Sequence, residues 1–198
     1  MKEKYADRFI IYTAVGLLCL CTCVQGGFFP ICIVFAGLIE CILIFTLKAK
    51  FNIKCICALV FCLWYLFCAV RPGFILEYTA NALLPLVSML FFIILTSLDV
   101  KTRRKISVGF IKLSVIIAFI SVICGVYTSL IHHKAERLTF PFQYSNACGI
   151  YFAVMIILSK QSGDKFIDKG RYIFYAALLM TQSIGAIILT ASAEIIYG

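Results

Sequence analysis

The sequence predicts an all-α fold, a polytopic membrane helix bundle of about seven transmembrane helices. Hydrophobic residues make up 63% of the chain and charged residues 14%, whereas soluble domains have about 45–50% and about 25%. The mean hydropathy is +1.05. The apolar residues fall into seven runs, and a helix of roughly 20 such residues crosses a bilayer core of about 30 Å. We therefore expect a single transmembrane domain over residues 1–198.

The apolar runs give the expected helices in chain order. They cover about residues 9–24, 28–47, 55–70, 82–98, 108–131, 146–158 and 172–191. The first run follows three basic residues and so looks like a secretory signal, but no small-residue cleavage site comes after it. We therefore interpret it as the first span. Pro30 is compatible with the second helix because a helix tolerates proline in its first turn.

Polar or turn-forming links separate these runs. In chain order they contain Gln25–Gly27, Lys48 to Lys54, Arg71-Pro72-Gly73, Asp99 to Lys105, His132 to Ser145, and Lys160 to Arg171. Alternate links, counted with the amino-terminal tail and Lys112, hold 15 of the 18 basic residues. Because cytoplasmic loops are enriched in Lys and Arg, we expect a cytoplasmic amino terminus. The link from His132 to Ser145 then lies outside.

The charge and the cysteines do not predict a nucleic-acid or metal site. The net charge of +9 comes from residues in the links, where basic residues set membrane topology. The 11 cysteines lie mostly inside apolar runs and form no C-x-x-C pair, which a zinc or redox site would show. We therefore expect no nucleic-acid partner, no metal and no cofactor, and we interpret the cysteines as small apolar residues.

Glu40 is the one acidic residue well inside an expected span. An unpaired carboxylate there costs about 2.5–3.5 kcal/mol on insertion scales. It is therefore expected to be protonated, paired, or directed toward the end of the helix at Lys48. The alternative role is proton or ion transport, but no second buried acid accompanies Glu40.

The external link holds the best candidates for a binding site. Arg71 and Arg137 lie on the side that otherwise has few positive charges, and a planar guanidinium binds phosphate through two hydrogen bonds. The alternative is that Arg137 only reaches lipid head groups. His132 is a possible general base or a solvated loop residue. Phe142 and Tyr144 fit an aromatic belt, and Asn146 is expected to cap the following helix.

Two segments resemble the O-antigen ligase and O-antigen polymerase family. The segment Arg137 to Tyr151 is similar to the family's external motif, in which an arginine precedes Phe-x-Tyr/Asn-x-Asn and a helix of small residues. The segment Leu178 to Ala186 is similar to its Thr-x-Ser-Arg-Gly-Ala helix, with Ile184 in place of the arginine. The family also has a large external loop and later spans. The resemblance therefore implies an amino-terminal portion or a shortened member.

The resemblance implies a function at the outer face of the bacterial cytoplasmic (inner) membrane. The chain would transfer or polymerise glycan from an undecaprenyl diphosphate carrier, so its partners would be this lipid-linked donor and the bilayer. Arg137 would hold the departing diphosphate, with Arg71 as a second candidate, and Tyr144, Asn146 and Ser183 would complete the binding site. No catalytic residue or oligomeric state is assigned. The alternatives are a transporter or flippase-like protein and a non-catalytic membrane scaffold.

Overall fold

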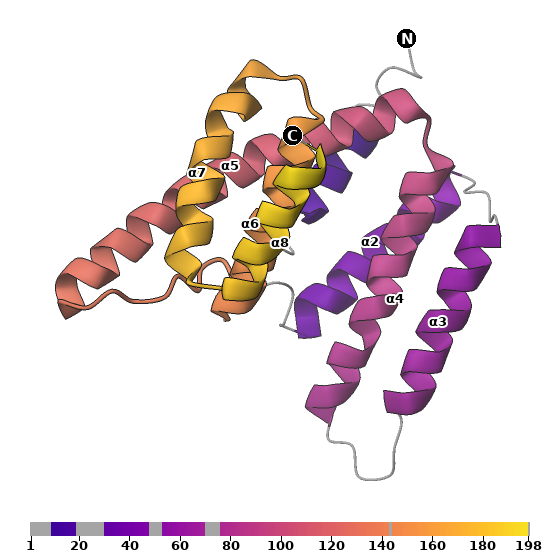
Figure 1. Ribbon diagram of the computed structural model, residues 1–198. Coiled ribbons are helices and arrows are strands. Elements are labelled where there is room, and N and C mark those ends of the chain that lie inside the picture. The colour runs from indigo at the N-terminus through magenta and orange to yellow at the C-terminus, as the bar shows by residue number, and fades with distance from the viewer. Residues whose placement is uncertain (1–8, 19–29, 48–52, 70–75, 143, 198) are drawn as a thin grey trace. The chain divides into compact units, whose positions relative to one another are not determined.

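The computed structural model describes residues 9–18, 30–47, 53–69, 76–142 and 144–197. These residues form helices and links, and no strand occurs among them, which confirms the all-α prediction. The contacts divide the chain into two compact units, Met1–Ile106 and Ser107–Gly198. Figure 1 shows the helices of each unit.

The first unit contains the helix Phe9–Leu18, α2 (Pro30–Leu47), α3 (Ile53–Ala69), α4 (Leu76–Ser97) and the first turns of α5 (Val100–His132). Helix α4 packs against both α2 and α3. One core cluster comprises Leu17, Ala36, Leu43 and Ile94. A second cluster comprises Cys62, Met89 and Ile93. Helices α2 and α3 lie on the expected spans 28–47 and 55–70, whereas α4 begins at Leu76, before the expected span 82–98. The expected span 9–24 is described only to Leu18.

Glu40 lies in this unit with only 3% of its surface exposed. Its Oε2 atom has no hydrogen-bond partner among the described residues, and Lys48 lies outside them. Of the three expected accommodations, pairing is therefore not observed for Oε2 among the described residues.

The second unit contains α5 from Ser107 onward, α6 (Ser145–Lys160), α7 (Lys165–Thr181) and α8 (Ile184–Tyr197). Helix α6 packs against both α7 and α8. The core of the second unit contains buried residues of all four helices, including Val115, Phe152, Phe174 and Ala186. Small residues allow close approach: a methyl group added at Gly170 would lie 2.6 Å from Cγ2 of Val115.

Contacts along these helices fix their directions. Gly149 of α6 lies beside Ser183 at the start of α8, and Lys160 at the end of α6 pairs with Glu194 near the end of α8. Helices α6 and α8 therefore run parallel, and α7 runs antiparallel to both. The expectation of one continuous helix over 172–191 is wrong, because α7 ends at Thr181 and the chain reverses at Gln182.

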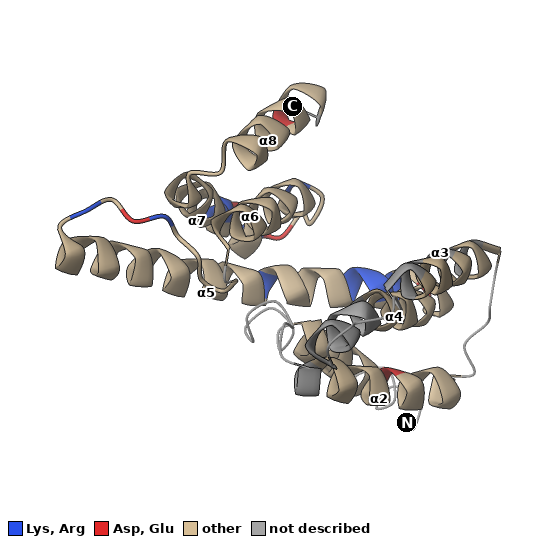
Figure 2. Ribbon diagram, turned by 90° about the horizontal axis from the view of Figure 1, so that it is seen from below, with Lys and Arg blue, Asp and Glu red and all other residues tan. Residues whose placement is uncertain are grey.

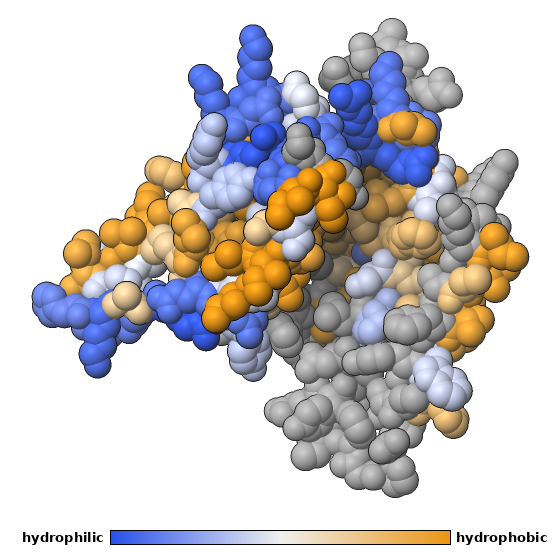
Figure 3. Space-filling view, viewed as in Figure 1, coloured by the Kyte–Doolittle hydropathy of each residue, from blue (hydrophilic) through white to orange (hydrophobic). Residues whose placement is uncertain are grey.

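Polar residues lie at both ends of the second unit. Figure 3 shows, at its left side, hydrophilic residues along the link after α5 and over the α6–α7 turn, with hydrophobic surface between them. Large apolar side chains are exposed on this surface, among them Ile188, Leu179 and Ile195. Among the described residues, α5 is the one helix that is both long and apolar enough to cross a membrane.

Candidate functional site

The candidate site begins with the link that follows α5. His133 adopts a left-handed conformation with a φ of 49°, and the Lys134 N–H donates to the Ser129 carbonyl at 3.3 Å. These two features end the helix in the manner of a Schellman turn. Farther along, the Leu138 N–H donates to the Met180 carbonyl at 2.9 Å, and the Leu138 side chain is buried. The link is thereby fixed to the end of α7. Figure 2 shows basic, acidic and basic residues in succession along it.

Arg137 connects the end of α7 with the start of α6. Its Nε donates to the Thr181 carbonyl at 3.2 Å, and its Nη2 donates to the Gln182 carbonyl at 3.1 Å and to Oδ1 of Asn146 at 3.3 Å. The two carbonyl groups belong to the carboxyl-terminal end of a helix, where a cation is stabilising. Nη1 makes no hydrogen bond within the part of the chain that the structure describes.

The chain reverses direction beside this guanidinium. Gln182 caps α7 in a left-handed conformation with a φ of 52° and a ψ of 29°. Oγ1 of Thr181 accepts a hydrogen bond from the Ser183 N–H at 3.3 Å and donates to the Leu178 carbonyl at 2.6 Å. Ser183 is buried and immediately precedes α8, and its carbonyl accepts from the Ile187 N–H at 3.0 Å.

The starts of α6 and α8 meet at the same end of the unit. A methyl group added at Gly149 would lie 2.6 Å from Cβ of Ser183 and 3.0 Å from Cβ of Ala186. Helix starts expose backbone N–H groups and bear partial positive charge. Arg137 therefore lies at an end where two helix starts also favour an anion.

Of the five expected binding residues, the structure brings Arg137 and Asn146 into contact, and Ser183 directly follows Gln182, whose carbonyl accepts from Arg137. Tyr144 immediately precedes α6 and is 61% exposed. Arg71 lies outside the described residues. The prediction that Asn146 caps α6 is wrong, because the capping position belongs to Tyr144. Asn146 is one residue inside the helix, where its side-chain oxygen accepts from Arg137 instead.

The structure also shows the surroundings of Phe142 and His132. Phe142, expected in an aromatic belt, packs edge-on against Tyr151 with 5.3 Å between the ring centroids. The Tyr151 hydroxyl donates to Oγ of Ser114 at 2.8 Å. His132 is exposed, and its Nδ1 lies 4.0 Å from Oε1 of Glu136. No group of three metal-binding side chains occurs among the described residues.

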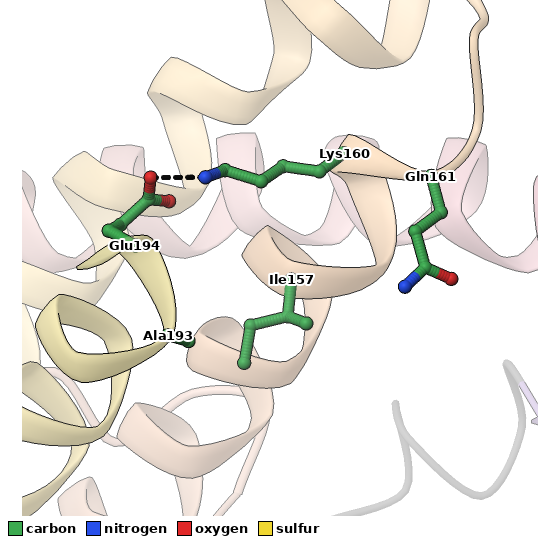
Figure 4. Close-up of a pocket in the computed structure, with 5 residues that line it drawn as sticks. All are labelled: Ile157, Lys160, Gln161, Ala193 and Glu194. Carbon is green, nitrogen blue, oxygen red and sulfur yellow. Dashed lines mark ion pairs between the residues drawn. The ribbon is translucent and has the colours of Figure 1, made fainter. Parts of the chain in front are cut away.

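A polar cluster at the opposite end of the unit was not predicted. Lys160 of α6 forms an ion pair with Glu194 of α8, as Figure 4 shows. Glu194 also accepts a hydrogen bond from the Tyr175 hydroxyl. The ion pair borders a hollow of about 180 Å³ whose other lining residues are Ile157, Gln161 and Ala193. Lys160 and Glu194 are 34 residues apart in the sequence, and the reversal of the chain after α7 brings them together.

The same end contains a second ion pair. Nζ of Lys112 lies 2.6 Å from Oδ2 of Asp164, and the hydrogen bond from Lys112 holds the pKa of Asp164 below its usual value. Asp164 also caps α7 by accepting from the Phe166 N–H at 2.9 Å. Nε of Arg171 donates to Oγ of Ser159 at 2.9 Å. Most of the charges at this end are therefore engaged in fixing the helix ends.

Comparison with known protein families, curated proteins and solved structures finds no match to this chain.

Proposed function

We propose that the chain is a multi-pass protein of the bacterial cytoplasmic membrane that binds the diphosphate of an undecaprenyl-linked glycan at the outer face. It would act in glycan transfer of the O-antigen ligase or polymerase type. The observation that supports this proposal is the contact of Arg137 with Asn146 and with the carbonyl of Gln182, the residue before Ser183. The two segments that resemble the family are far apart in sequence, yet they meet at one end of the second unit.

The surface of the chain supports the membrane placement. Large apolar residues are exposed on every described helix, with Phe45 at 83%, Phe67 at 75% and Ile195 at 85%. Exposed apolar area of this extent is typical of a surface that contacts another apolar phase. Helix α6 has 16 residues, a length of about 24 Å, so its two polar ends would lie near the two faces of a bilayer.

The donors around Arg137 suit the chemistry that the resemblance implies. In glycan transfer an acceptor hydroxyl oxygen bonds to the anomeric carbon, and the bond from this carbon to the diphosphate oxygen breaks. The electron pair stays on the departing diphosphate, whose charge nearby cations stabilise. Arg137 would supply the N–H groups of its Nη1, which bond to no described residue, and the starts of α6 and α8 would supply partial positive charge. The base that takes the acceptor's proton is not assigned.

A binding experiment tests this role. The full chain in nanodiscs would be titrated with undecaprenyl diphosphate, and Arg137→Ala is expected to weaken binding at least about tenfold, since charge-assisted hydrogen bonds contribute about 1.5–3 kcal/mol. Arg137→Lys should retain part of the binding because it keeps the charge. Lys165→Gln, an exposed change at the opposite end, is the matched control. Equal binding by all four proteins, each shown to be folded, would remove Arg137 from the site.

Topology is tested separately by labelling single cysteines with a reagent that does not cross membranes. In a chain without its natural cysteines, Thr139→Cys should react in intact cells, whereas Gln161→Cys should react only after the cytoplasmic face is opened. Ser192→Cys should behave like Gln161→Cys, because α8 ends at the same end of the unit as Lys160. Labelling of Ser192→Cys together with Thr139→Cys would contradict the proposed path of α8.

The turn after α7 does not support the transporter alternative. Transporter sites use spans that are interrupted and then continue across the membrane. Here α8 runs back along α6 instead of continuing α7, so the break is a reversal between two antiparallel helices.

A further inference from the structure

A hollow with an apolar wall lies beside the link that contains Arg137. It has a volume of about 410 Å³ and is lined by Val126, Ser129, Leu130, His133, Lys134, Ala135 and Met180. Its volume lies within the about 300–1,000 Å³ typical of small-molecule sites. Val126 and Leu130 are 47% and 67% exposed, so the wall formed by α5 is open to whatever surrounds the protein.

The floor of the hollow depends on one close contact between α5 and α7. A methyl group added at Gly125 would lie 2.7 Å from Cε of Met180 and 3.0 Å from Cδ1 of Leu138. The absence of a side chain at Gly125 therefore lets Met180 lie against α5. Val126, Leu130 and Met180 give the hollow its apolar side, which suits a hydrocarbon chain.

The charged rim is on the link side of the hollow. Lys134 is exposed and has no ion-pair partner among the described residues. The acidic group nearby is Glu136, whose Oε1 lies 4.0 Å from the His132 ring and whose backbone N–H donates to Oγ of Ser129 at 3.3 Å. His133 also faces the hollow, and Arg137 is already bonded to α6 and α7. Lys134 is thus the cation available to a ligand in the hollow.

We infer that this hollow binds one anionic phospholipid, with an acyl chain along Val126, Leu130 and Met180 and its phosphate beside Lys134. A hydrocarbon chain matches the open apolar side, and the phosphate matches Lys134, which has no ion-pair partner among the described residues. This combination favours a lipid over a peptide, because the N–H and C=O groups of a peptide would find few hydrogen-bond partners on the apolar side of the hollow. The inference rests on the membrane placement proposed above, but it does not require that the chain transfers glycan.

Native mass spectrometry of the full chain tests this inference. The protein would be released from nanodiscs that contain equal amounts of phosphatidylglycerol and phosphatidylcholine. We expect the wild type to retain one phosphatidylglycerol, and Lys134→Gln to lower this retention about fivefold, the factor that one basic residue near anionic lipid contributes. Ala135→Trp, which fills the hollow from an exposed link position, should lower retention without removing a charge. Lys165→Gln at the opposite end should retain the lipid as the wild type does.

Several results would overturn the inference. Equal retention by the wild type and Lys134→Gln, with unchanged unfolding temperatures, would remove Lys134 from the site. Equal retention of phosphatidylcholine would show that charge has no part in binding. Displacement of phosphatidylglycerol by undecaprenyl phosphate would assign the hollow to the carrier lipid instead. Release of the wild-type chain from membranes by alkaline carbonate would overturn the membrane placement itself, an outcome distinct from the other three.

Discussion

Gly149 provides the sharpest test of how the second unit is packed. In Gly149→Ala the added methyl group would meet Cβ of Ser183 at 2.6 Å and Cβ of Ala186 at 3.0 Å. Carbon atoms normally pack at about 3.5–4.0 Å. Both neighbouring atoms are fixed to the backbone of α8, so a change of rotamer cannot relieve the contact. The start of α8 must therefore move away from α6.

The expected magnitude follows from two opposing terms. Overpacking of this kind costs about 1–3 kcal/mol, whereas replacing glycine by alanine in a helix interior returns about 1 kcal/mol. Gly149→Ala should therefore lower the free energy of unfolding by about 1 kcal/mol. Gly185→Ala in α8 is the matched control, because a methyl group added there meets nothing within 4 Å. It should raise the free energy of unfolding by up to about 1 kcal/mol.

The assay is denaturant unfolding of the variants in one detergent, with the slope checked for constancy. The double variant Gly149→Ala/Ser183→Gly should recover part of the loss, because it removes the closest contact while a glycine at a helix cap costs only a few tenths of a kcal/mol relative to serine. If Gly149→Ala stabilises the protein as Gly185→Ala does, α6 and α8 do not approach as described. If the double variant shows no recovery, Ser183 is not the obstructing neighbour.

Three further predictions concern the helix ends of this unit. The pKa of Asp164 is lowered in the folded state, so its pairing with Lys112 stabilises the fold at pH values above the ordinary aspartate pKa. The variant Asp164→Asn retains a capping group but loses this charge. The difference in unfolding temperature between the wild type and this variant should shrink as the pH falls below about 4. Gln182→Gly should raise the free energy of unfolding in denaturant by about 1 kcal/mol, since glycine adopts the left-handed conformation without steric cost; a loss of stability would show that the Gln182 side chain is needed. Glu194→Gln should lower the unfolding temperature less than Glu194→Ala, because the amide can still accept from Tyr175; equal losses would assign the effect to the Lys160 ion pair alone.

The positions of most helices could be predicted because the side chains that form the core of a helical protein are apolar and occur in continuous runs. The expected span 55–70 corresponds to α3 at Ile53–Ala69. The same criterion missed polar helix starts. Helix α5 begins at Val100, where Oδ2 of Asp99 accepts from the Thr102 N–H at 3.1 Å, and α7 begins at Lys165 after the cap at Asp164. An aspartate before a helical segment is a recognised signal of a helix start. The starts of α5 and α7 could therefore be predicted from Asp99 and Asp164, although not from the apolar runs.

The reversal at Gln182 could not be predicted in this way. Glycine or proline usually marks such a turn, and neither residue stands between Thr181 and Ile184. The left-handed conformation at Gln182 is stabilised by tertiary contacts, chiefly the donation from Arg137 to the carbonyl groups of Thr181 and Gln182. A pattern read along one segment cannot reveal a partner that lies 44 or 45 residues away.

This dependence changes how Arg137 has to be understood. The sequence offered two roles for it, phosphate binding or contact with lipid head groups, and the structure adds a third, the closing of a helix end. Three of its five N–H groups serve the fold, so loss of activity in Arg137→Ala would report on the turn as much as on a ligand. Lysine can keep a charge near the α7 carbonyls but cannot form the planar, forked contact. Full stability in Arg137→Lys together with diphosphate binding weaker than in the wild type would therefore assign the Nη1 group to the ligand, whereas parallel losses of stability and binding would assign Arg137 to the turn alone.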